Sequence, residues 1–189
     1  MGVKMANPEI VLLVGVTNVG KTTTGRIFAN KLGYDFFDLD QEVKSFYGMT
    51  LDKFERQHPF PCDRQKLKTE VLKNLVYGCK RDAVIAVTLL VYARFYNSLI
   101  KEEDVICIEL QDSAKHIFER LVFCDENDIP YRDEINANEH KAHYMREVRK
   151  DITFFRKMFS KVELKCDIDN RDPGAVADEL IKLIRTVRS

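Results

Sequence analysis

The chain has 189 residues, of which 45% are hydrophobic, and its 30 basic and 30 acidic side chains give a formal net charge of zero. A chain of this size and composition can bury one continuous core. The charge balance argues against a nucleic acid as the main partner, because such affinity depends on an excess of Lys and Arg. The longest apolar run, residues 84–93, is about half as long as a bilayer span, so a membrane is not an expected partner either.

Five cysteines are scattered along the chain, at positions 62, 79, 107, 124 and 166. Their number is odd and none forms a C-x-x-C pair, which argues against a disulfide framework or a metal cage. The first residues, MGVKMANPEI, show no apolar stretch with a cleavage site. We therefore expect free thiols and a cytoplasmic protein.

Short apolar runs predict a set of buried strands. The first run, residues 9–14, is almost continuously apolar and breaks at Gly15, which is typical of a strand covered on both faces. Later runs have similar lengths and compositions. The predicted strands are 9–14, 34–37, 83–87, 104–110 and 162–166.

Helical periodicity alternates with these strands, because apolar residues recur at intervals of three and four. Gly33 suits the end of the first helix and Pro173 the start of the last. Parallel strands need crossover connections, which helices supply, so we expect a single domain over residues 1–189 with a three-layer α/β/α sandwich and a parallel sheet. The predicted helices are 21–32, 63–79, 113–122, 141–159 and 173–187.

One long segment interrupts this alternation. Residues 125–139 read DENDIPYRDEINANE and are polar, acidic and poor in core residues. A loop of this length inside a compact domain is usually either a working lid or a disordered tip. With the residues around it, we interpret 123–140 as a lid.

Residues 15–22, GVTNVGKT, match the phosphate-binding pattern G-x-x-x-x-G-K-[ST] between a predicted strand and a predicted helix. The glycines let the backbone wrap around phosphate oxygens, and the helix N-terminus adds partial positive charge. Lys21 can reach the β- and γ-phosphates and Thr22 can ligate Mg²⁺. We therefore expect ATP and Mg²⁺, with these residues at the nucleotide: Gly15, Asn18, Val19, Gly20, Lys21, Thr22 and Thr23.

From Gly15 to Phe54 the chain resembles the shikimate kinases, small P-loop kinases that phosphorylate a cyclic polyol acid with ATP. The resembling features are GKTTTGR, Leu32-Gly33, the acids at 38 and 40, and Gly48-Met49-Thr50 before a short helix. A weaker similarity returns at residues 167–184, DIDNRDPGAVADELIKLI. The resemblance implies a P-loop NTPase fold of the nucleoside-monophosphate-kinase type.

The resemblance also implies roles for particular side chains. Asp40 corresponds to the carboxylate that binds the substrate hydroxyl, and Asp38 to the acid near the metal. Arg64 corresponds to an arginine that grips the substrate carboxylate, within a substrate-binding segment over 40–75. Arg149 lies near the second such arginine, and Arg171 lies in the loop on the adenine side.

The sequence departs from the family pattern in three places. Residues 87–91 read VTLLV where the family has a triple glycine, and His58-Pro59-Phe60-Pro61 replaces a Gly-Glu pair. In the lid, Ile129-Pro130-Tyr131-Arg132 replaces Arg-Pro-Leu-Leu, so Arg132 or Arg120 is the candidate for the cation that neutralises charge during transfer.

The leading hypothesis is an ATP-dependent phosphotransferase acting on a hydroxyl of a small molecule, with shikimate as the first candidate. Lys21 and Asp40 are the expected catalytic residues. The departures leave two alternatives open: a nucleotide-binding regulatory module without transfer activity, or a related kinase for gluconate or a nucleotide. We expect a monomer or a weak dimer.

Overall fold

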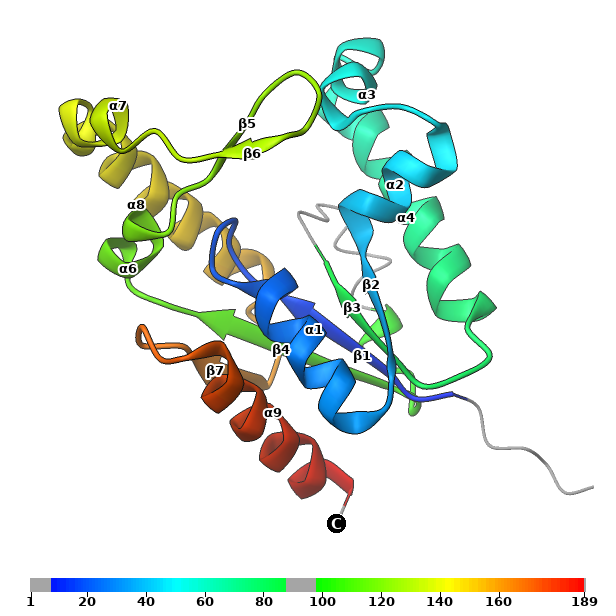
Figure 1. Cartoon of the computed structure of the whole chain (residues 1–189). Helices are drawn as coiled ribbons and strands as arrows, with labels where there is room; N and C mark the ends of the chain where they lie inside the picture. Colours follow the sequence, from blue (N-terminus) through cyan, green and yellow to red (C-terminus); the bar gives the residue numbers. More distant parts are fainter. Residues whose placement is uncertain (1–7, 88–97, 189) are drawn as a thin grey trace, which may run out of the picture.

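The computed structural model describes residues 8–87 and 98–188 and is built on a five-stranded parallel sheet (Figure 1). The order of the strands is β2-β3-β1-β4-β7, so the chain goes from β1 to the edge strand β2, returns to β3 beside β1, and then continues on the other side of β1 through β4 to β7. All five predicted strands are present, close to their predicted boundaries. The strands are β1 (Ile10–Val14), β2 (Asp35–Asp38), β3 (Ala83–Ala86), β4 (Val105–Gln111) and β7 (Leu164–Asp167).

Two interior strands of the sheet, β1 and β3, show why the apolar runs in the sequence are so continuous. Every residue of β1 and of β3 is buried, because helices cover both faces of the sheet. In register, Val11 lies between Val84 of β3 and Ile106 of β4. The core is therefore centred on β1, and the loop that leaves its carboxyl end starts from a fixed position.

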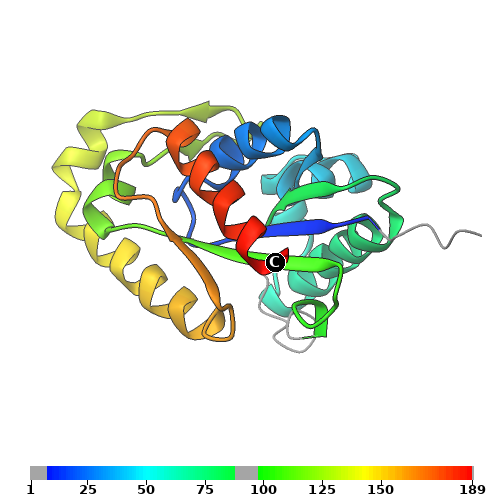
Figure 2. The same cartoon turned by 90° about the horizontal axis from the view of Figure 1, so that it is seen from below.

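Helices cover the sheet on both sides. Helices α1 (Lys21–Leu32) and α9 (Pro173–Arg188) pack together on one face, and α4 (Pro61–Gly78) and α8 (Lys141–Met158) lie on the other (Figure 2). Helix α1 approaches the sheet closely, since a Cβ at Gly25 would stand 2.8 Å from the Phe36 ring. The predicted three-layer α/β/α sandwich is confirmed.

Two short helices follow β2. Helix α2 (Leu39–Tyr47) was not expected from the sequence; it begins because the Asp38 side chain accepts a hydrogen bond from Asp40 N. Helix α3 (Leu51–Gln57) is the short helix that the resemblance implies, with Thr50 as its N-cap. Together they place the 40–57 segment above the carboxyl ends of the strands (Figure 1).

The 125–139 segment is more ordered than its composition suggested. Strands β5 (Phe123–Cys124) and β6 (Pro130–Tyr131) form an antiparallel hairpin, and α7 (Glu134–Glu139) follows. The expectation of a long loop without secondary structure is therefore wrong. The physical reason is local: Asp125 accepts hydrogen bonds from Asn127 N and Ile129 N, and Asp133 caps α7.

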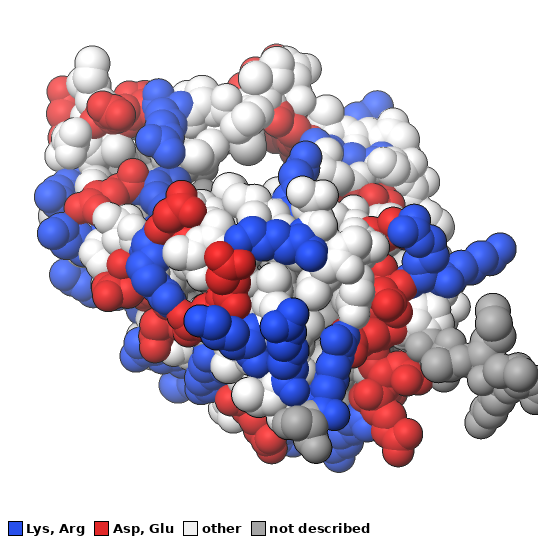
Figure 3. Space-filling view, turned by 60° about the horizontal axis from the view of Figure 1, so that its bottom comes forward, with Lys and Arg blue, Asp and Glu red and all other residues white. Residues whose placement is uncertain are grey.

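Helix α6 (Ala114–Glu119) precedes the hairpin and is shorter than the predicted 113–122. In the ranges that the structure describes, no helix is long and apolar enough to cross a bilayer. Basic and acidic side chains are interspersed on the face seen in Figure 3. The altered stretch 87–91 begins with the buried Val87, and its residues 88–91 lie outside the described residues.

Candidate active site

The loop between β1 and α1 curls tightly because of its glycines. Gly15 has a φ of 142°, and a Cβ there would stand 2.5 Å from the carbonyl oxygen of Leu110, so no other residue fits. Asn18 and Gly20 also have positive φ values, of 61° and 111°. Successive amides in such a conformation form an anion-binding concavity, which the N-terminus of α1 extends. We call residues 15–22 the phosphate cradle.

Lys21 is the buried cation of the phosphate cradle. Its Nζ donates hydrogen bonds to the carbonyl oxygens of Gly15 (2.8 Å) and Val16 (2.9 Å), and the residue is 7% exposed. Burial lowers the pKa of Lys21 to about 8, against the opposing attraction of Asp40 and Asp38. The ammonium is therefore poorly solvated. This favours the binding of an anion, whose interactions replace those with water that the ammonium loses on burial.

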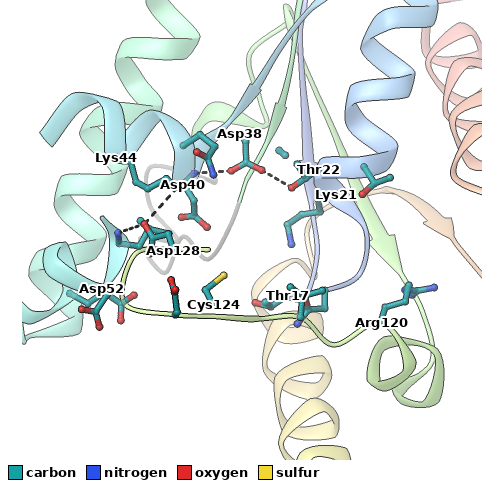
Figure 4. Close-up of a pocket in the computed structure, with 18 of the residues that line it drawn as sticks. Thr17, Lys21, Thr22, Asp38, Asp40, Lys44, Asp52, Arg120, Cys124 and Asp128 are labelled. Carbon is teal, nitrogen blue, oxygen red and sulfur yellow. Dashed lines mark hydrogen bonds and ion pairs between the residues drawn. The ribbon is translucent and has the colours of Figure 1, made fainter. Parts of the chain in front are cut away.

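A chain of hydrogen bonds connects the phosphate cradle to α2. Thr22 Oγ1 donates to Asp38 Oδ2 over 2.6 Å, and Asp38 Oδ1 accepts from Asp40 N over 3.1 Å (Figure 4). Thr22 and Asp38 thus present two neighbouring hard oxygen atoms beside the phosphate cradle. Mg²⁺ prefers such donors, together with water and phosphate oxygens, so the residues present fit this metal.

The phosphate cradle opens into a cavity of about 780 Å³ that reaches α2, α3 and the hairpin (Figure 4). A volume of this size accommodates a nucleotide tail with a small acceptor. Seven of the residues predicted from the sequence line it: Asn18, Gly20, Lys21, Thr22, Thr23, Asp38 and Asp40. Gly15 and Val19 are buried beneath it as part of the loop backbone.

The end of the cavity remote from Arg120 is rich in charged residues, and we call it the acceptor end. Asp40 lies there with its Oδ1 atom 2.9 Å from Lys68 Nζ. On α3, Arg56 pairs with Asp52, with Nε and Oδ2 2.9 Å apart. Both members of the α3 pair line the cavity, and Lys68 does not.

The hairpin closes over the acceptor end through Asp128. This residue has a φ of 59°, and its Oδ2 accepts a hydrogen bond from Leu51 N over 2.7 Å and stands 3.6 Å from Lys44 Nζ. The Asp128 side chain is only 9% exposed. The hairpin, drawn across the top of Figure 1, is therefore fastened to both α2 and α3.

Two arginines of the lid region face the cavity, and they differ in their contacts. Arg120 Nη2 donates to Asp112 Oδ2 over 2.5 Å, while Arg120 Nε is buried without a hydrogen bond to any described residue. Burial would raise the pKa of Asp112, but hydrogen bonds from Arg120, His116 and Ser113 N lower it. Arg132 also lines the cavity, and no ion pair joins it to the part of the chain described.

Three predicted arginines do not reach the cavity. Arg64 Nη1 donates to the carbonyl oxygens of His58 and Pro59, over 3.0 and 3.2 Å. Arg149 lies on the outer side of α8 in a shallow groove with other basic residues. Arg171 is held by Glu179 and by the carbonyl oxygens of Asp167 and Ile168. Their proposed ligand contacts stay predictions.

Three residues that shape the acceptor end were not predicted from the sequence: Lys44, Lys68 and Asp128. The spacing of the sequence did indicate Lys68, because position 68 is one helical turn after position 64 and both share a face of α4. No local pattern indicated Asp128, since its partner Leu51 is 77 residues away in the chain.

A parallel α/β sandwich with a phosphate cradle after its first strand, and with Asp40 in the same cavity, defines a P-loop kinase. The family model for shikimate kinase matches residues 17–185. The chain belongs to the shikimate kinase family and is a small-molecule kinase that transfers a phosphoryl group to a hydroxyl.

Individual relatives agree with this assignment. A shikimate kinase of Chlorobium limicola is 29% identical over 97% of this chain and 91% of its own. The solved shikimate kinase of Bacteroides thetaiotaomicron has a TM-score of 0.74 at 16% identity, covering 94% of this chain and 98% of its own. The shikimate kinase of Acinetobacter baumannii, solved in complex with shikimate, has a TM-score of 0.72 at 21% identity, with coverages of 96% and 94%. At these identities, the two structures support the fold.

Proposed function

We propose that the chain transfers the γ-phosphoryl group of ATP to a hydroxyl of shikimate. The observation that carries this proposal is the shared cavity, which Lys21 and Thr22 line beside Asp40. Membership of the family and the complex of the Acinetobacter baumannii relative with shikimate support the choice of acceptor.

In this proposal the phosphate cradle receives the triphosphate of ATP. Free amides of the cradle and of Thr23 donate to phosphate oxygens, and Lys21 exchanges its two carbonyl partners for the phosphates. Thr22 and Asp38 would hold Mg²⁺, which supplies charge neutralisation for the phosphates when it is bound. The interactions stabilise negative charge where it develops during transfer.

Asp40 would orient the reacting hydroxyl of the acceptor. The hydroxyl oxygen forms a bond to the γ-phosphorus while the bond from this phosphorus to the bridging oxygen breaks, and that electron pair stays on ADP. The hydroxyl proton passes to the Asp40 carboxylate and then to water. Because the transition state of phosphoryl transfer is loose, orientation and charge neutralisation supply most of the rate.

For the lid, residues 123–140, we propose Arg132 as the cation at the transferring group. Arg120 is already paired with Asp112, whereas Arg132 lines the cavity with no ion pair to a described residue. The segment 40–75 would bind the acceptor, since Asp40, Asp52 and Arg56 all come from it.

An ADP-release assay tests the proposal with Mg·ATP and three acceptors: shikimate, gluconate and a nucleoside monophosphate. We expect ADP release that depends on shikimate, with a phosphorylated product seen by mass spectrometry. Release with gluconate or a nucleotide instead would contradict the choice of acceptor. Binding of Mg·ATP by calorimetry, with no release for any of them, would indicate the regulatory module.

We also propose that the protein works in the cytoplasm as a monomer or weak dimer. All five cysteines are free thiols in the structure, which suits a reducing compartment. Size-exclusion chromatography with light scattering tests the oligomeric state.

A further inference from the structure

Lys68 of α4 forms an ion pair with Asp40. Its Nζ stands 2.9 Å from Asp40 Oδ1, and the side chains are only 12% and 21% exposed. Asp40 lines the cavity whereas Lys68 does not. Lys68 therefore contacts the carboxylate without occupying the space that an acceptor would fill.

The packing of α4 against α2 makes this contact possible. Arg64 and Lys68 are one turn apart on the same face of α4. The Arg64 guanidinium is turned toward the carbonyl oxygens of His58 and Pro59 at the start of the helix. Of these two α4 cations, Lys68 is thus the one that reaches the residue expected to hold the acceptor hydroxyl.

The other cations of the acceptor end have different partners. Lys44 stands 3.6 Å from Asp128, and Arg56 pairs with Asp52. Neither forms an ion pair with Asp40 in the described parts of the chain. Among the described residues, Lys68 is thus the cation in ion-pair contact with Asp40, and Lys21 attracts the same carboxylate without forming an ion pair.

Asp40 is fixed at two points. Its backbone N–H donates to Asp38, which in turn accepts from Thr22 of the phosphate cradle, and its Oδ1 accepts from Lys68. Among the described residues, no hydrogen bond engages the other carboxylate oxygen, Oδ2. An ion pair this shielded from water restricts rotation of the carboxylate more than an exposed pair would.

We propose that Lys68 is a positioning residue for phosphoryl transfer: it holds Oδ1 of Asp40 so that Oδ2 faces the reacting hydroxyl of the acceptor. The inference rests on the proposed function of Asp40. Arg64, in its observed position, does not contact Asp40, so Lys68 is the cation of α4 that does. The pair sets the angle at which the hydroxyl meets the γ-phosphorus, and small errors in such an angle are costly.

The test compares Lys68→Met, Lys68→Arg and the control Lys66→Met in steady-state kinetics with Mg·ATP and shikimate. Lys66 is on the same helix, is 61% exposed and does not line the cavity. For Lys68→Met we expect kcat to fall by about ten- to a hundredfold with little change in the KM for ATP. Lys68→Arg should recover much of this loss, and Lys66→Met should match the unmodified chain.

A double-mutant cycle with Asp40→Asn separates positioning from a general structural effect. If Lys68 acts through Asp40, Lys68→Met costs little further kcat once Asp40 is Asn. An equal loss in both backgrounds, or a Lys68→Met kcat equal to that of the unmodified chain, would overturn the inference. If the unmodified chain does not turn over shikimate, the proposed function fails and the inference fails with it.

Discussion

The phosphate cradle and the acceptor end lie in one cavity but are assembled in different ways. The cradle is a contiguous stretch, and Lys21 bonds to carbonyl groups only five and six residues away. The acceptor end joins Asp40 to Lys68 across 28 residues and Asp128 to Leu51 across 77. Both of these contacts depend on how α2, α3, α4 and the hairpin pack.

The difference shows where this chain keeps the family pattern and where it departs from it. The phosphate cradle keeps every fixed position of the pattern, whereas the altered lid, which lies over the acceptor end through Asp128, does not keep the family residues. All P-loop kinases bind the phosphates of ATP, so one geometry of the loop backbone suffices for this task. In the proposed function, recognition of the acceptor depends on long-range packing, to which the contact of Lys68 with Asp40 belongs.

The largest expected effect is in the phosphate cradle. We expect Lys21→Ala to lower kcat by about a thousandfold or more, because the variant loses the cation that faces the developing charge. The control is Lys31→Ala, at the other end of α1, where Lys31 pairs with Asp178 and donates to the carbonyl oxygen of Gly174, away from the cavity. Steady-state kinetics and a melting curve measure both variants. Turnover close to normal in Lys21→Ala would refute its role.

Asp40→Asn probes the acceptor end at its centre. We expect kcat to fall by about a hundredfold, since the amide cannot take the hydroxyl proton, while the affinity for ATP changes little. Asp35→Asn is the matched control, because Asp35 starts the same strand that Asp38 ends and pairs with Arg81 at the surface. Equal losses of kcat and ATP affinity in Asp40→Asn would count against a role at the acceptor.

Asp128→Ala should loosen the hairpin over the acceptor end. We expect the KM for shikimate to rise about tenfold, because a buried charge-assisted hydrogen bond to Leu51 N and an ion pair with Lys44 are lost. Cys124 on β5 lines the cavity and reports the opening, so its alkylation by N-ethylmaleimide should accelerate, with the exposed Cys62 as internal reference.

Lys44→Met separates opening from electrostatics in the same measurement. Burial raises the pKa of the Cys124 thiol, Asp128 raises it further, and Lys44 lowers it. Loss of the Lys44 charge alone would therefore slow alkylation, because the thiolate is the reactive form. Faster alkylation in Lys44→Met would support a fastened hairpin, and slower alkylation would contradict it.

The smallest effect concerns pH at the phosphate cradle. Because the pKa of Lys21 is lowered to about 8, the free protein loses this charge as pH rises through that value. Binding of ATP then requires proton uptake, so we expect the affinity for Mg·ATP to fall by about threefold between pH 7.5 and 8.5. Lys21→Arg should flatten this dependence, since a guanidinium does not titrate there. The same slope in both proteins would show that another group is responsible.

Stability has the opposite dependence on pH for the same residue. The folded-state pKa of Lys21 lies below the ordinary value of 10.5, so between about 8 and 10.5 the unfolded chain binds more protons than the folded one. The cost of the buried charge is therefore fully present below about pH 8 and decreases as pH rises. The Lys21 ammonium, for which we propose phosphate binding, is thus a local cost to the fold.

Particular elements show how far sequence reasoning reached. Helix α1 was predicted at its observed boundaries, 21–32, because glycine is typical of the position after a helix. In the structure Gly33 ends the helix with a φ of 72°. Helix α2 was missed although Asp38 caps it: an acidic pair after a strand suits a turn, a cap and a functional site alike. The hairpin in the lid was missed because its strands have only two residues each, too few for any periodic pattern.

The sequence by itself determined the five strands of the parallel sheet, the main helices that cover it and the phosphate cradle, because apolar periodicity and glycine conformations act over a few neighbouring residues. Only the tertiary structure decided that Arg64 faces backbone carbonyl groups, that Lys68 holds Asp40, and that Asp128 joins the hairpin to α3. Those contacts join residues that the chain separates by a few to many tens of positions. The contacts of Lys68 and Asp128 depend on the angles at which whole elements pack, which no local pattern encodes, whereas the Arg64 contacts depend on how the chain turns into α4.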